Sequence, residues 1–96
     1  MTRRAIFRFR LYTAEGTQNS TQARANLAAL CRLHLPDRYE IEIVDVFRES
    51  KRALADGIRM TPTLIKLSPA PLCRIVGTLS DARLVLLALG LQAVAA

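Results

Sequence analysis

Two kinds of hydrophobic spacing alternate along this chain, and their order restricts the possible folds more than any other feature. Phe7, Phe9 and Leu11 alternate with arginine and tyrosine residues, and this period of two indicates a strand. Between Ser20 and Pro36 the apolar residues recur at helical spacing instead. Further segments of both kinds follow. We expect strands over residues 5–12, 39–46, 62–67 and 72–76, and helices between Ser20 and Pro36, over 51–56 and over 81–91. The predicted class is α/β, in the order βαβαββα.

Side chains that can accept from the free N–H groups of a first helical turn precede each predicted helix. We expect Asn19 or Ser20 to cap the first helix, Ser50 the second and Ser80 the third. Asp81 would follow in the first turn of the third helix, where negative charge meets the helix dipole. That third helix is apolar nearly all round, which predicts burial on two sides or a place at an interface.

The length and charge of the chain limit its class. Its 96 residues suit a single domain over 1–96. A net charge of +6 favours acidic partners, but no block of consecutive basic residues exists and stacking aromatics do not interleave with them, so we expect no nucleic-acid role. We see no apolar segment that suggests a signal peptide or a membrane span, and we expect a cytoplasmic protein without a membrane role.

The predicted element order, with a proline that opens the third strand, resembles that of thioredoxin. Thioredoxin chemistry needs a reactive thiolate and a second thiol at the start of the first helix. Here residues 15–20 read Glu-Gly-Thr-Gln-Asn-Ser. Cys31 lies on the apolar stripe of the first helix and is expected in the core, while Cys73 is less constrained. We therefore predict no enzyme activity, no cofactor and no metal site.

Pro62 follows Thr61 at the start of the third predicted strand. In the thioredoxin order a proline at this place is typically cis, and X–Pro bonds are the ones in which the cis form is accessible. The alternative is a trans proline that merely begins an edge strand.

An ordered set of short motifs resembles the KaiB family. The set runs from about residue 6 to about residue 91, and each piece matches a stretch typical of the family. The pieces are Leu11-Tyr12-Thr13-Ala14, Asn19-Ser20, Val44-Asp45-Val46, Thr61-Pro62-Thr63-Leu64, Arg74-Ile75-Val76-Gly77 and Leu79-Ser80.

This resemblance implies a non-catalytic regulator that binds KaiC, a ring-shaped ATPase, and modulates its phosphorylation and ATPase cycle. It also implies fold switching. Family members adopt a tetrameric ground state, βαββααβ, or a thioredoxin-like monomer, βαβαββα, which is the form that binds KaiC. The implied partner surface is the second strand with the short helix after it, and it maps to Tyr39, Glu42, Lys51 and Asp56.

Departures from the family pattern cluster in the second half of the chain. Ala88 and Gly90 stand where the family often has a glycine and an aspartate, and a run of three prolines is reduced to Pro69 and Pro71 around Ala70. Alanine in place of glycine within a helix is favourable by about 0.5–1 kcal/mol, whereas Gly90 lies where glycine can end a helix. We therefore predict the thioredoxin-like form as the resting state.

Glu42 takes the place of a lysine usual in the family, and this reversal leaves two readings of the partner open. The partner is a KaiC-like ATPase, or the chain is a thioredoxin-like adaptor for another signalling or stress-response protein. Glu42 itself is either a contact residue or part of a solvated strand face. We expect a monomer in the thioredoxin-like form, while the apolar last helix leaves a dimer or tetramer open.

Overall fold

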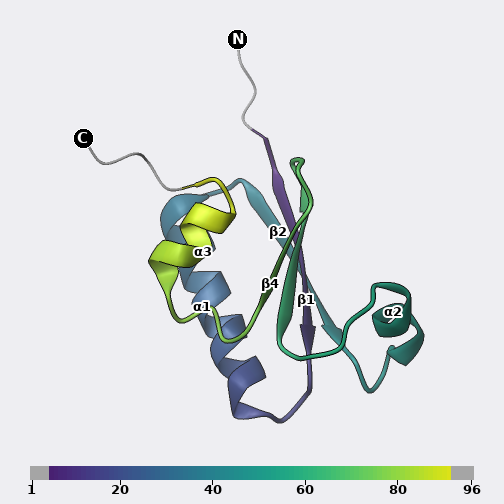
Figure 1. Ribbon diagram of the computed structural model, residues 1–96. Helices are drawn as coiled ribbons and strands as arrows, with labels where there is room; N and C mark the ends of the chain where they lie inside the picture. Colours follow the sequence, from purple (N-terminus) through teal and green to yellow (C-terminus); the bar gives the residue numbers. More distant parts are fainter. Residues whose placement is uncertain (1–4, 92–96) are drawn as a thin grey trace.

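The structure, a computed structural model, describes residues 5–91 (Figure 1). Its elements follow the thioredoxin-like order βαβαββα that the sequence predicts, and not the alternative order βαββααβ. They are β1 (Phe7–Thr13), α1 (Gln18–His34), β2 (Tyr39–Asp45), α2 (Ser50–Ala55), β3 (Thr63–Ser68), β4 (Cys73–Val76) and α3 (Ala82–Ala88). No helix in this part of the chain has the length and apolar character that crossing a membrane requires.

The four strands form one sheet in the order β2-β1-β3-β4. β1 runs parallel to β2 and antiparallel to β3, and β3 runs antiparallel to β4. Figure 1 shows α1 and α3 on one side of this sheet and α2 on the other. β1 is therefore a central strand whose two faces meet different helices.

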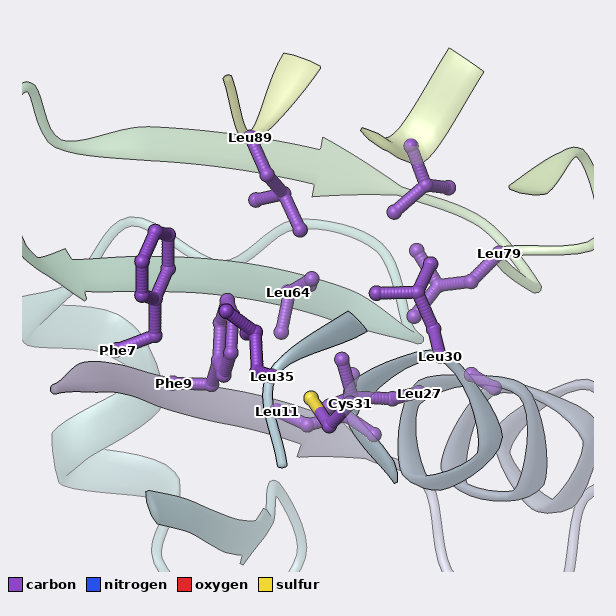
Figure 2. Packing of buried hydrophobic residues seen from close by; sticks show 12 residues of the cluster. Phe7, Phe9, Leu11, Leu27, Leu30, Cys31, Leu35, Leu64, Leu79 and Leu89 are labelled. Atoms are coloured by element: carbon purple, nitrogen blue, oxygen red, sulfur yellow. The ribbon is translucent and has the colours of Figure 1, made fainter. Parts of the chain in front are cut away.

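The main core lies between the sheet and the pair α1 and α3 (Figure 2). Phe9 and Leu11 of β1 and Leu27 of α1 are almost completely buried there. Burial of side chains of this size contributes about 1.5–3 kcal/mol each. Cys31 is fully buried in the same cluster, as the apolar stripe of α1 predicts.

A second, smaller cluster lies on the opposite face of the sheet, beneath α2. It consists of Tyr12, Val44, Ala53 and Ile65, with Val46 and Ile58 packed against it. Because side chains alternate between the faces of a strand, Tyr12 lies on this face together with Arg8 and Arg10. The period of two in the first strand thus separates an apolar face from one that carries polar groups.

The helix starts differ from the predicted ones. Thr17, and neither Asn19 nor Ser20, is the N-cap of α1, and its hydroxyl accepts from the Ser20 N–H at 3.4 Å. The Ser20 hydroxyl accepts instead from the Ala14 N–H at 2.9 Å, in a buried position that ties the loop to the helix. α2 begins at Ser50 itself, after Glu49, which makes no side-chain capping bond.

α3 also begins one residue later than predicted and ends earlier. Asp81, in place of Ser80, is the N-cap and accepts from the Leu84 N–H at 3.2 Å. The helix stops at Ala88 because Gly90 adopts a φ of +74°, and the Leu91 and Gly90 N–H groups donate to carbonyls of the last turn. This is a Schellman ending, which glycine favours.

Only one side of α3 is buried, so burial on two sides, the first of the two predicted alternatives, is wrong. A place at an interface stays a prediction. Val85 and Leu89 face the main core, whereas Leu84 and Leu87 are exposed. The outer side of α3 therefore presents apolar side chains to solvent.

Candidate functional site

The loop between β1 and α1 occupies the place where a thioredoxin-like redox site would lie. Tyr12 pairs with Thr63, so this loop and the Thr61–Pro62 bond lie at the same end of the sheet. The Thr61–Pro62 bond is cis, as are Ser68–Pro69 and Ala70–Pro71. The loop is closed by Thr17, whose hydroxyl donates to the Ala14 carbonyl at 2.7 Å. A hydroxyl thus stands near the helix start where redox chemistry would need a thiolate.

Neither cysteine lies near this end of α1. Cys31 is buried thirteen residues beyond Gln18, or about 20 Å along the helix axis. Burial raises the pKa of its thiol to about 11, which disfavours the thiolate. Cys73 opens β4, and its sulfur lies 3.5 Å from the Ala88 carbonyl oxygen. Within residues 5–91 no group of three His, Cys, Asp or Glu side chains is placed to hold a metal ion.

The polar groups of the opposite sheet face converge beneath α2. Arg10 of β1 lies between two carboxylates, with its Nε 2.9 Å from Glu42 Oε1 and its Nη1 3.1 Å from Asp56 Oδ2. Glu42 belongs to β2 and pairs with Arg10 in the parallel register, while Asp56 ends α2. One arginine therefore connects two strands to the end of the short helix.

Further contacts extend this arrangement along α2. Arg52 Nη2 lies 2.9 Å from the Glu42 carboxylate, and its Nη1 lies 3.0 Å from Glu49 Oε1. The Tyr12 hydroxyl donates to Asp56 Oδ2, and the Arg74 guanidinium donates to the Asp56 carbonyl oxygen. We call the set Arg10, Tyr12, Glu42, Glu49, Arg52, Asp56 and Arg74 the α2 network.

The α2 network stabilises the ionised forms of its acids. Hydrogen bonds from Arg10 and then Arg52 lower the pKa of Glu42. The hydrogen bond from Tyr12, followed by that from Arg10, lowers the pKa of Asp56. Burial, and then the bond to Asp56, raises the pKa of Tyr12. Both carboxylates are therefore held as anions beside their partners. The Arg10–Asp56 pair is also partly shielded from solvent, since these side chains are only 24% and 30% exposed.

The structure brings together two of the four residues that the resemblance implies for partner binding. Glu42 and Asp56 meet in the α2 network, and Lys51 lies on the exposed side of the same helix. Tyr39 does not join them, since it packs against the main core on the other face of the sheet.

Arg10 and Arg52 are members of the network that the sequence did not single out for this site. Arg10 lies 32 residues from Glu42 and 46 from Asp56. The strand register brings Arg10 to Glu42, and the position of α2 over the sheet brings it to Asp56. The one available signal was the pair of arginines on the polar side of the first strand.

Asp45, in the middle of one family motif, has a structural role. Its Oδ1 accepts from the Glu15 N–H and from the Phe47 N–H, both at 3.3 Å. This carboxylate therefore holds the β1–α1 loop against the turn that leads into α2.

Solved structures of low sequence identity share this fold. The crystal structure of chloroplastic thioredoxin z superposes with a TM-score of 0.76 at 15% identity, over 92% of this chain and 80% of that chain. The solution structure of the N-terminal domain of SasA from Synechococcus elongatus gives 0.71 at 15% identity, over 100% and 94%. With the cysteine-free loop described above, the chain is a thioredoxin-like domain whose helix start lacks the redox pair.

The sequence comparisons identify the branch of that class. The KaiB domain matches residues 10–91. The circadian clock protein KaiB3 of Synechocystis sp. is 45% identical over 80 residues, which are 83% of this chain and 78% of that protein. The circadian clock oscillator protein KaiB of Synechococcus elongatus is 36% identical over 91 residues, 95% of this chain and 89% of that protein. The chain therefore belongs to the KaiB family of non-catalytic circadian clock proteins.

Proposed function

We propose that this chain is a regulator that binds a KaiC-type ATPase and modulates the phosphorylation and ATPase cycle of that enzyme. In this proposal the chain acts in the cytoplasm, and residues 1–96 form one domain. The observation that carries the proposal is the thioredoxin-like order of the elements, because this is the form that the family resemblance implies for KaiC binding. The cysteine-free start of α1 supports a binding role for the same scaffold.

We propose a monomer for the free chain. Its proposed contact surface is the side of the sheet that carries β2 and α2. Lys51 projects from the exposed side of α2, next to the network that holds Glu42 and Asp56. Tyr39, on the other face, would contribute only from the start of β2, at the rim of this surface.

Fold switching is the second part of the proposal. In the structure Ala88 is the last residue of α3, and Gly90 ends that helix. Both positions, with Pro62, Pro69 and Pro71, lie in the half of the chain that the family rearranges. Alanine at position 88 favours the helix and with it the thioredoxin-like form at rest.

Co-migration with the KaiC-type ATPase of the same cell tests the binding proposal. The two proteins are mixed with and without ATP and separated by size-exclusion chromatography. We expect a complex in at least one nucleotide state. If the two proteins elute separately in both states, the binding proposal is overturned.

A thioredoxin-like adaptor for a different protein is the second candidate. Glu42 favours this candidate. Its carboxylate forms ion pairs with Arg10 and Arg52, and it replaces a basic residue usual in the family. Capture of a different protein on the wild-type chain, lost when α2 residues are changed, would support this candidate.

A further inference from the structure

Three large apolar side chains lie exposed on the connection between β2 and β3. Phe47 precedes α2, Leu54 belongs to it, and Met60 follows it, with exposed fractions of 74%, 77% and 63%. Single exposed apolar residues are common on protein surfaces, whereas apolar residues gathered in one patch mark interaction sites. These three lie on one short segment around α2.

Basic side chains accompany these apolar residues. The Arg48 side chain is 86% exposed, and its only ion pair within residues 5–91 is a 3.9 Å contact with the largely buried Asp45. Lys51 and Arg59 are exposed and form no ion pair in the described part of the chain. Lys51 and Leu54 are three residues apart and are therefore neighbours on the helix. We call Phe47, Arg48, Lys51, Leu54, Arg59 and Met60 the α2 cap.

The acids near the α2 cap are already engaged. Glu42 contacts Arg10 and Arg52, and Glu49 contacts Arg52. Asp56 accepts from Arg10 and from Tyr12. The carboxylates therefore balance cations within the α2 network, while the cations of the cap are presented to solvent.

We infer that the α2 cap binds an acidic protein surface that has apolar side chains at its centre. Interfaces combine large apolar anchors with a polar rim, and opposite charge steers the partners together. This inference rests on the proposed function for the identity of the partner, a KaiC-type ATPase, and adds the chemistry of the surface that it must offer. It also gives Glu42 and Asp56 a positioning role, since they hold α2 in place while basic and apolar neighbours make the contact.

An anionic membrane would share part of this chemistry, but the shape of the cap favours a protein. Helices that lie on membranes separate a continuous apolar face from a basic face. α2 has only six residues, and Lys51 and Leu54 share its exposed side.

Charge-reversing variants test the inference against the ATPase. The double variant Lys51→Glu/Arg59→Glu should bind the KaiC-type ATPase roughly tenfold more weakly or worse, which corresponds to about 1.4 kcal/mol. The matched control Arg32→Glu/Arg83→Glu makes the same charge change on exposed residues of α1 and at α3, and it should bind within about twofold of the wild type. Binding of the wild type should weaken as KCl is raised.

The apolar part is tested in the same assay. Phe47→Ser/Leu54→Ser should lose binding by a similar factor, whereas Leu84→Ser/Leu87→Ser, on the exposed side of α3, should not. All four double variants change exposed side chains, and circular dichroism checks their folding. If both α2 cap variants bind the ATPase as tightly as the wild type, the inference is wrong and the proposed function stands.

A second probe separates the inference from the identity of the partner. The ¹⁵N-labelled chain is titrated with a short amphipathic peptide of Glu, Leu and Phe, and with the same peptide in which every Glu is Lys. We expect the acidic peptide alone to shift the amide resonances of residues 46–60. This result without any ATPase binding would support the inference and reject the proposed function. Shifts confined to other segments, no shifts, or binding only to phosphatidylglycerol vesicles would overturn the inference.

Discussion

The phenol of Tyr12, on the central strand, donates a hydrogen bond to the carboxylate of Asp56 at the end of α2. Tyr12 is completely buried in the small cluster beneath α2, while Asp56 is also held by Arg10. This contact joins the apolar packing under the helix to the ion pairs beside it. It therefore makes the position of α2 depend on the sheet.

Removal of that hydroxyl should loosen α2 and destabilise the fold. Hydrogen bonds to charged groups contribute about 1.5–3 kcal/mol, and the partial exposure of Asp56 reduces this to about 1–2 kcal/mol for Tyr12→Phe. Urea denaturation followed by circular dichroism measures the loss. Tyr39→Phe, on the other face of the sheet, is the matched control and should change stability by less than about 0.5 kcal/mol. Equal effects of the two variants would contradict the role of the Tyr12 bond.

Acid should weaken the fold through Glu42 and Asp56. Arg10 and Arg52 lower the pKa of Glu42, and Tyr12 and Arg10 lower that of Asp56. A carboxylate whose pKa is lower in the folded state contributes stability above its unfolded-state pKa of about 4 and loses it as the pH falls through the folded value. The free energy of unfolding should thus be steady between pH 7 and about pH 5 and fall below about pH 4. The variant Glu42→Gln/Asp56→Asn should be less stable at neutral pH and show a flatter decline. Parallel curves for both proteins would argue against this linkage.

The two thiols should differ sharply in reactivity. With its pKa raised to about 11 by burial, Cys31 carries only about one thousandth of its thiol as thiolate at pH 8. Ellman's reagent should therefore titrate Cys73, which is half-buried, in the native protein and both thiols after denaturation. The Cys73→Ser variant should show no rapid reaction. Rapid modification of Cys31 in that variant would contradict its burial in the main core. Reduction of insulin disulfides at a rate comparable to thioredoxin would contradict a start of α1 without a redox pair.

The end of α3 should control the resting fold. Ala88→Gly removes a favourable helical residue and costs up to about 0.5–1 kcal/mol, which changes an equilibrium by roughly two- to fivefold. Solution NMR of the free wild type should show helical shifts over residues 82–88, and the variant should show more of a second form in which they are lost. Strand shifts over these residues in the wild type would reject the thioredoxin-like resting state.

Gly90→Ala tests the stop of the same helix. Its φ of +74° disfavours any residue with a Cβ atom by roughly 1–2 kcal/mol. The cost comes from the backbone conformation and not from a steric clash, because a Cβ atom at Gly90 would meet no atom within 4 Å. The variant should unfold at lower urea concentration than the wild type, and unchanged stability would contradict the observed helix ending.

The order of the elements was predictable because the longer ones follow from a repeated spacing. The alternation of Phe7, Phe9 and Leu11 predicts β1 from local sequence alone. The apolar stripe that includes Leu27 and Cys31 predicts α1 in the same way. Errors in such patterns move the ends of an element but leave its type unchanged.

The helix caps were harder, because several neighbouring side chains could each accept the same bond. Thr17 and Ser20 both can cap α1, and the structure uses one as the cap and the other to bind the loop through the Ala14 N–H. Ser80 and Asp81 present the same ambiguity at α3. The choice depends on how the loop approaches the helix, and local sequence does not determine that path.

The candidate site was predictable only in part. The resemblance implied Glu42, Lys51 and Asp56, and the structure places these three on the α2 side of the sheet. It also implied Tyr39, which the structure places on the other face. The ion pairs of Arg10 depend on strand register and on where α2 lies over the sheet. Neither can be predicted from a short segment of the sequence.

Hydrogen–deuterium exchange of the chain, alone and with the KaiC-type ATPase of its own cell in the presence of ATP, tests the central claim most directly. The claim is that a non-catalytic thioredoxin-like domain binds this partner through the β2 and α2 side of its sheet. We predict slower exchange over residues 39–60 in the complex and unchanged exchange in the middle of α1. Protection confined to α1 and α3, or no protection at any residue, would contradict the claim.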